Sequence, residues 1–163
     1  MRHLMILRHA KSSWADETMR DHERPLNRRG RQAAGAMGRF MADEGLLPDL
    51  IISSDSARTR ETVALWSEGA RWNGPVEFEA ELYHAAAETL LETARSASEA
   101  FDRIMLVAHN PGIAEFVSRA AGRLTDMPTA TLAAFELTSP SWNRASLEAM
   151  NLVVHQRPRE LSE

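Results

Sequence analysis

Short apolar runs of strand length alternate along this chain with longer stretches of helical periodicity. Three apolar runs have the length of a strand, 4–7, 50–52 and 104–108, and 76–79 is a further possible short strand. Apolar runs this short, separated by helical patterns, are typical of an α/β domain with a mostly parallel sheet. Near the end of the chain, 130–137 and 147–154 flank a polar stretch. They predict an antiparallel hairpin at one side of the sheet.

Four helices are predicted between the strands: 28–43, 58–68, 87–98 and 111–121. Asn27 is the expected N-cap of the first, and Gly45 is expected to end it. For the fourth, we expect Asn110 at the N-cap and Pro111 at the first helical position. The long polar connection 11–25 follows the first strand, and polar loops of this length in compact domains are usually functional.

Length, composition and charge narrow the class of protein. The chain has 163 residues, of which 44% are apolar and 26% charged, so we expect one globular domain over 1–163. The net charge of −4 provides no global basic field, and we predict no nucleic-acid or membrane partner. Because the chain has no cysteine, thiolate catalysis and disulfides are excluded. The apolar run at 4–7 is too short for a signal sequence, and the expected location is the cytoplasm.

Basic side chains follow three of the predicted strands, at the sheet edge where α/β proteins bind ligands. Arg8 and His9 follow the first strand, Arg58 comes shortly after the second, and His109 follows the run 104–108. Arginine forks match phosphate oxygens, and a neutral imidazole beside them is a competent nucleophile toward phosphorus. The sequence therefore predicts a site for a phosphoryl group.

Each of these residues also has a structural explanation when it is taken singly. An Arg-His pair after a strand is commonly a solvated strand end, and a histidine after a strand commonly caps it. Arg58 could pair with Glu61 or Thr62 on a helix surface. The coincidence at successive strand ends favours the functional interpretation.

The motifs around these residues resemble a known family. Leu-Arg-His-Ala at 7–10 resembles the Arg-His-Gly signature of the histidine phosphatase superfamily, which has the phosphoglycerate-mutase-like fold, with Ala10 in place of glycine. The segment 53–62 resembles the family's Ser-Ser-Pro-x-x-Arg-x-x-x-Thr segment, with Asp55 where proline is common, and 107–111 resembles its second-histidine segment. Arg-Pro-Leu-Asn-Arg-Arg-Gly at 24–30 resembles the SixA-type phosphohistidine phosphatases. The resemblance covers nearly the whole chain, in order.

This resemblance implies a fold, a reaction and a set of site residues. The implied fold is a three-layer α/β/α domain with a central, mostly parallel sheet. His9 would attack phosphorus and become transiently phosphorylated, and water would then release phosphate. The groups implied to hold the phosphoryl oxygens are Arg8, Arg58 and His109, with Arg24 and Asn110 as further substrate-binding residues. Arg24 could equally be a loop arginine that bridges to Asp21 or Glu23.

The chemistry of phosphoryl transfer adds two expectations. Two arginines and an imidazolium around the group supply the charge stabilisation, so we predict a reaction without metal or other cofactor. The attacking nitrogen of His9 must carry no proton, so its other ring nitrogen is expected to donate to an acceptor such as a backbone carbonyl.

The family's general acid is the point at which this sequence departs from the pattern. Phosphomonoesterases of the superfamily carry a carboxylic acid in the segment that is Glu81-Leu82-Tyr83-His84 here, so either Glu81 or His84 is the candidate acid. An alkoxide leaving group, with a basicity near that of hydroxide (water's pKa is ~15.7), needs a proton donor. Neutral imidazole, whose conjugate acid has a pKa of about 6.5, leaves more easily. The departure therefore favours phosphohistidine in a protein as substrate, over small phosphomonoesters or phosphoanhydrides. An inactive module that binds phosphate or a phosphoprotein is the alternative from another class.

Overall fold

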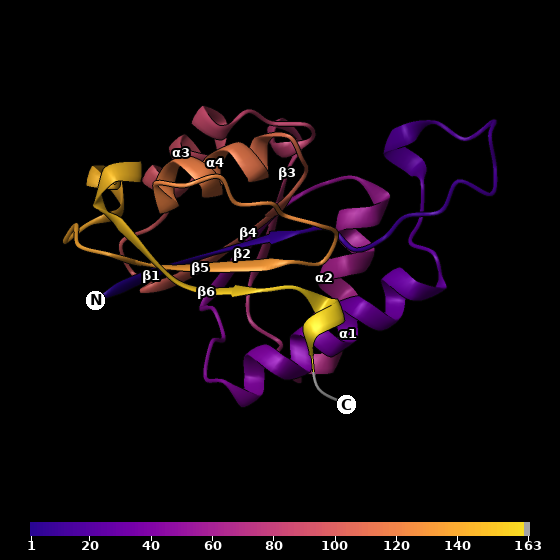
Figure 1. Ribbon diagram of the computed structural model, residues 1–163, viewed down its shortest axis with the longest axis horizontal. Coiled ribbons are helices and arrows are strands. Elements are labelled where there is room, and N and C mark those ends of the chain that lie inside the picture. The colour runs from indigo at the N-terminus through magenta and orange to yellow at the C-terminus, as the bar shows by residue number, and fades with distance from the viewer. Residues whose placement is uncertain (162–163) are drawn as a thin grey trace.

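The computed structural model describes residues 1–161 and contains one six-stranded sheet (Figure 1). The strands are β1 (Arg2–Arg8), β2 (Leu50–Ser54), β3 (Val76–Glu79), β4 (Arg103–Ala108), β5 (Leu132–Leu137) and β6 (Met150–Gln156). Their order across the sheet is β3-β2-β4-β1-β5-β6. The first four strands in this order are parallel, whereas β5 runs antiparallel to both β1 and β6. The predicted strands and the terminal hairpin are confirmed.

Helices cover both faces of the sheet and complete the predicted three-layer α/β/α architecture (Figure 1). The helices are α1 (Arg28–Asp43), α2 (Ala57–Ala70), α3 (Ala87–Arg95) and α4 (Gly112–Ala121). Successive side chains of β1 point to opposite faces, so Met5 packs with Trp66 and the rest of the α1–α2 layer. Leu4 packs with Phe116 in the α3–α4 layer. The central strands therefore read as continuous apolar runs because both of their faces are buried.

The boundaries of several predicted elements differ from the structure, and for three of them the structure shows why. Helix α3 ends at Arg95 rather than at 98, and Ser98 Oγ accepts a hydrogen bond from the Ala100 N–H in a local turn that competes with the helix. Strand β5 starts at 132 rather than at 130, because Ala130 has a left-handed backbone (φ 59°) that no strand accommodates. Strand β6 starts at 150 because 147–149 form a 3₁₀ turn.

The start of α4 also corrects the prediction. The helix begins at Gly112, so Pro111 occupies the cap position instead of the first helical position. The Asn110 side chain still satisfies a free donor of the first turn, since its Oδ1 accepts from the Ala114 N–H at 3.1 Å. The expected N-cap of α1 is confirmed, because Asn27 accepts from the Gly30 N–H at 2.8 Å.

The long loop after β1 folds back along its own return to α1. The Ser13 N–H donates to the Pro25 carbonyl, and the Asn27 N–H donates to the Lys11 carbonyl. Helix α1 packs so closely here that a Cβ at Gly30 would lie 2.1 Å from the Lys11 carbonyl oxygen, which explains the glycine at this position. The loop is thereby held over the carboxyl end of the sheet. Within residues 1–161, no helix has the length and apolar character needed to cross a membrane.

Candidate active site

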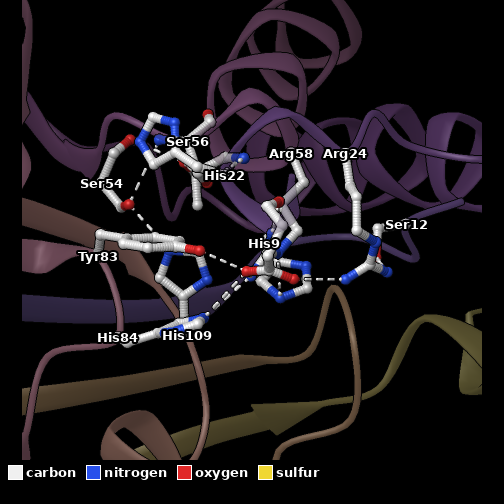
Figure 2. A network of polar contacts seen from close by, with 12 residues as sticks. His9, Ser12, His22, Arg24, Ser54, Ser56, Arg58, Tyr83, His84 and His109 are labelled. Carbon is white, nitrogen blue, oxygen red and sulfur yellow. Dashed lines mark hydrogen bonds and ion pairs between the residues drawn. The ribbon is translucent and has the colours of Figure 1, made fainter. Parts of the chain in front are cut away.

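A cleft of about 180 Å³ at the carboxyl ends of β1, β2 and β4 brings the predicted site residues together (Figure 2). The predicted residues that line it are Arg8, His9, Arg24, Arg58, His84, His109 and Asn110. The register of the sheet explains why two of these residues are neighbours. Arg8 of β1 pairs with Ala108 of β4, so His9 and His109, which follow these two strands, lie side by side. Their ring centroids are 5.2 Å apart.

Hydrogen bonding fixes the ring of His9. Its Nδ1 lies 2.7 Å from the Ala10 carbonyl oxygen. A carbonyl oxygen can only accept a hydrogen bond, so Nδ1 must be the donor and carries the ring hydrogen. This leaves a lone pair on Nε2, which faces Arg58 Nε at 3.4 Å. Burial lowers the pKa of His9 to about 3. The hydrogen bond to Ala10 acts in the opposite direction, and the positive charges of Arg58 and Arg8 lower the pKa further. His9 is therefore a neutral imidazole at neutral pH, and its unprotonated Nε2 accepts a hydrogen bond from Arg58 Nε.

Ala10 fits where the family signature has glycine. Its backbone has a negative φ, its side chain is fully buried, and its N–H donates to Thr62 Oγ1 at 3.0 Å. Thr62 belongs to the 53–62 motif, so this bond ties that motif to the strand that carries His9.

Burial favours the neutral form of His109, whereas the imidazolium expected from the sequence belongs to the ring beside a bound phosphoryl group. Burial lowers its pKa to about 2, and the neighbouring His9 and Arg58 lower it further. Its Nε2 lies 2.8 Å from Ser54 Oγ. The Ser54 hydroxyl can donate to Nε2 while its oxygen accepts from the Ser56 N–H, and in that arrangement the ring proton of His109 lies on Nδ1.

Two buried donors in the cleft lack protein partners. Neither Nδ1 of His109 nor Nε of Arg8 has a hydrogen-bond partner among the described residues. Arg8 is held by its Nη1, which donates to the Met127 carbonyl at 3.2 Å. Because buried donors without partners are costly, both atoms suit the oxygens of a bound anion.

Asp21 is a member of the site that the sequence did not identify as such. Its carboxylate accepts from Arg58 Nη2 at 3.0 Å, from Arg24 Nη1 at 2.8 Å and from the Tyr83 hydroxyl. Partial burial raises the pKa of Asp21, but the bonds from Tyr83, Arg24 and Arg58 outweigh it and hold that pKa well below its usual range. Asp21 therefore stays ionised and orients two guanidinium groups toward the cleft.

Arg24 combines the two roles that its sequence left open. It is bridged to Asp21, and it also lines the cleft with only 6% of its surface exposed. Its Nε donates to the Ser13 carbonyl at 3.0 Å, and its guanidinium lies 3.2 Å from the centroid of the Trp14 ring. Trp14, which is 70% exposed, forms part of the rim.

Of the remaining candidate residues, His84 and Asn110 line the cleft and Glu81 does not. His84 adjoins the cleft, with its Nε2 3.2 Å from Arg58 Nη2 and 3.4 Å from Asp21 Oδ2. Glu81 instead lines a separate cavity next to β3 and α3. The amide of Asn110 is engaged at both ends, because Nδ2 donates to the Met127 carbonyl at 3.0 Å and Oδ1 caps α4. Among residues 1–161, no group of three or more His, Cys, Asp or Glu is placed to hold a metal ion.

The two buried histidines are expected to make stability depend on pH. Each has a lowered pKa in the folded protein, whereas in the unfolded chain it titrates near 6.5. Below that pH the unfolded chain binds protons that the folded protein excludes, so the free energy of unfolding falls by about 1.4 kcal/mol per pH unit for each histidine. This loss begins near pH 6.5 and continues toward pH 3.

Urea unfolding of the wild type and of His109→Gln between pH 6.5 and 4.5 measures this effect. The wild type is expected to lose about 2 kcal/mol more than the variant over that range, because glutamine does not titrate. Parallel pH curves for the two proteins would contradict a neutral, buried His109.

Comparison with known proteins agrees with this geometry. Residues 4–87 match the family described as the histidine phosphatase superfamily, branch 1. An uncharacterised chloroplastic protein of Arabidopsis thaliana is 34% identical, with 88% of this chain and 70% of that protein covered. The chain belongs to the histidine phosphatase superfamily.

Solved structures define the type more narrowly. A protein provisionally named phosphohistidine phosphatase SixA from Agrobacterium tumefaciens has a TM-score of 0.83 and 29% identity, covering 96% of this chain and 98% of that one. Another provisionally named SixA, from Nakamurella multipartitia, has a TM-score of 0.82 and 26% identity, covering 96% of both chains. Within the superfamily the chain is therefore of the SixA type, with the phosphoglycerate-mutase-like fold. It is a phosphatase, and its substrates are phosphorylated.

Proposed function

We propose that this phosphatase removes the phosphoryl group from phosphohistidine in a protein, with His9 as its nucleophile. The observation that carries the proposal is the His9 ring itself. Its Nδ1 proton is held by the Ala10 carbonyl, and its neutral Nε2 is directed at Arg58 inside the cleft. A lone pair held beside a guanidinium is placed to attack a phosphorus atom whose oxygens that guanidinium binds.

The reaction balances with these residues alone. The Nε2 lone pair of His9 forms a bond to phosphorus while the N–P bond of the substrate breaks. When the other ring nitrogen of the substrate carries a proton, the group that leaves is neutral imidazole. Arg8 Nε, Arg58 and His109 Nδ1 supply donors for the phosphoryl oxygens. Water then attacks phosphorus, gives its protons to the phosphate product, and restores neutral His9.

The carboxylates near the site support a nitrogen-linked substrate. A general acid must be protonated before it can donate, but Asp21 is held ionised by Arg24, Arg58 and Tyr83. Glu81 faces a different cavity, so no carboxylic acid in the cleft is placed to donate, and His84 is the one candidate acid of the sequence that lines it. A phosphomonoester would need such a donor, because its leaving group is a strongly basic alkoxide. Phosphohistidine does not need one, because neutral imidazole is a weak base whose conjugate acid has a pKa of about 6.5.

A substrate panel tests this proposal. Phosphate release is measured from a phosphohistidine peptide and from several small phosphomonoesters, with and without EDTA. We expect kcat/KM to be higher for the peptide by at least about a hundredfold, and EDTA to have no effect. Equal or faster turnover of the esters would move the function to small phosphomonoesters. No turnover of any substrate would support a binding module.

The variant Glu81→Gln tests whether Glu81, one of the two candidate acids of the sequence, acts as a general acid. Because Glu81 lies outside the cleft, this variant is expected to keep the wild-type kcat within about twofold on every substrate that the enzyme accepts. Steady-state kinetics on the phosphohistidine peptide and on the fastest ester check this. A large loss confined to the ester would assign Glu81 as a general acid and contradict the argument from its position.

A further inference from the structure

A second hollow, which we call the basic groove, adjoins the catalytic cleft. It measures about 610 Å³ and lies between α1, the start of the loop after β1 and the C-terminal segment. Four cations line it: Lys11, Arg29, Arg39 and Arg159. Its apolar lining residues are Ala33, Ala36, Pro158 and Leu161. Lys11 and Thr129 line both hollows, so the groove lies next to the catalytic cleft.

The charge of the groove is unbalanced. No acidic residue from the described part of the chain lines it, and within residues 1–161 none of its four cations forms an ion pair. Arg39 also lines the next hollow, between α1 and α2, to which Arg31 and Arg71 add further charge against one acid, Glu68. A protein with a net charge of −4 thus gathers positive charge along one path that starts at the phosphate cleft.

We propose that the basic groove binds an acidic segment of the protein that carries the phosphohistidine. This inference rests on the proposed function. With the phosphoryl group in the cleft, the substrate chain can pass Lys11 and place its carboxylates against Arg29 and Arg39. The small apolar side chains of the groove accept the aliphatic parts of that segment.

The chemistry of the lining favours a protein over a nucleic acid. Surfaces that bind single strands combine cations with aromatic rings on which bases stack. Among the residues that the structure describes, no aromatic side chain lines either hollow beyond the cleft. An acidic polypeptide needs only the cations and the apolar contact that the groove supplies.

The test uses two phosphohistidine peptides that differ in four residues next to the phosphohistidine, which are glutamate in one and glutamine in the other. We expect wild-type kcat/KM to be about tenfold higher for the glutamate peptide at low ionic strength, and the two values to converge at about 0.5 M salt. Arg29→Glu with Arg39→Glu is expected to remove this preference. Neither side chain makes a hydrogen bond or ion pair among the described residues, so the fold should be retained.

A matched control carries the same charge change elsewhere. Arg123 follows α4 on the opposite layer, and Arg144 lies in the connection between β5 and β6, at the sheet end where β1 begins. Arg123→Glu with Arg144→Glu is expected to keep the tenfold preference. Hydrolysis of free phosphohistidine should be equal for all three proteins within about twofold. A preference that survives in the groove variant, or one absent from the wild type, would overturn the inference.

A binding measurement keeps this inference separate from the proposed function. Fluorescence anisotropy of the same peptides without phosphate needs no turnover, and the glutamate peptide is expected to bind the wild type about tenfold more tightly than the glutamine peptide. If no phosphohistidine substrate is hydrolysed but this difference is found, the proposed function fails and the groove is upheld. Tighter binding of a single-stranded oligonucleotide than of the glutamate peptide would identify a nucleic-acid surface instead and contradict the inference.

Discussion

Replacing His9 by alanine is expected to lower kcat by at least about 10⁴-fold on every substrate that the wild type hydrolyses. The variant loses the one nitrogen that the site holds neutral, tautomerically fixed and directed at Arg58. Removing a nucleophile costs far more than removing a residue that only binds, because the covalent intermediate forms on the nucleophile itself.

Phosphate release at saturating substrate measures this loss. His155→Ala is the matched control, since His155 lies on β6 and bonds to the Asp126 carbonyl, away from the cleft. It should retain wild-type turnover. Residual activity of His9→Ala within about tenfold of the wild type would mean that water attacks phosphorus directly, and the role assigned to His9 would be wrong.

The second large effect is expected at Arg58, whose replacement by alanine should lower kcat by about 10³-fold. This guanidinium contacts His9 Nε2, Asp21 and His84 at once. It is 4% exposed, so its charge acts in a site from which water is largely excluded. Its removal takes away the charge that we propose stabilises the phosphoryl oxygens, and it leaves the Asp21 carboxylate without one of its two guanidinium partners.

Two substitutions make this prediction specific. Arg58→Lys retains the charge but not the fork, so it should recover only part of the loss. Arg60→Ala is the control, two residues further along α2, where Arg60 is exposed and lies over the Phe78 ring. Its kcat should match that of the wild type. Full activity in Arg58→Lys would show that a point charge suffices and would contradict the need for a guanidinium at this position.

Most of the fold follows from local patterns in the sequence. The strands β1, β2 and β4 are short apolar runs because they are buried on both faces, and that burial leaves a clear signal. The boundaries that were missed depend on backbone geometry that composition does not encode. The left-handed backbone of Ala130, which delays β5, has no signal in the sequence, because alanine has no preference for that conformation.

Some residues of the site could also be predicted from the sequence, and others could not. His9, Arg58 and His109 could be predicted because each directly follows a parallel strand or begins the next helix, and such positions converge at one sheet edge. Asp21 and Tyr83 could not be placed with them. Their meeting depends on how the loop after β1 folds over the sheet, and this is set by backbone hydrogen bonds between residues distant in that loop. The spacing between Asp21 and Arg24 gave the only local indication of the pair.

The most direct test of the account is to trap the covalent intermediate. The enzyme is mixed with a phosphohistidine peptide labelled in its phosphoryl group, quenched in alkali within the first turnover, and digested for mapping of the label. We predict labelled phosphate on the peptide that contains His9, absent from Arg58→Ala at the same time point. Label on another residue, or rapid phosphate release with no labelled enzyme at any time, would contradict the assignment of His9 as the nucleophile.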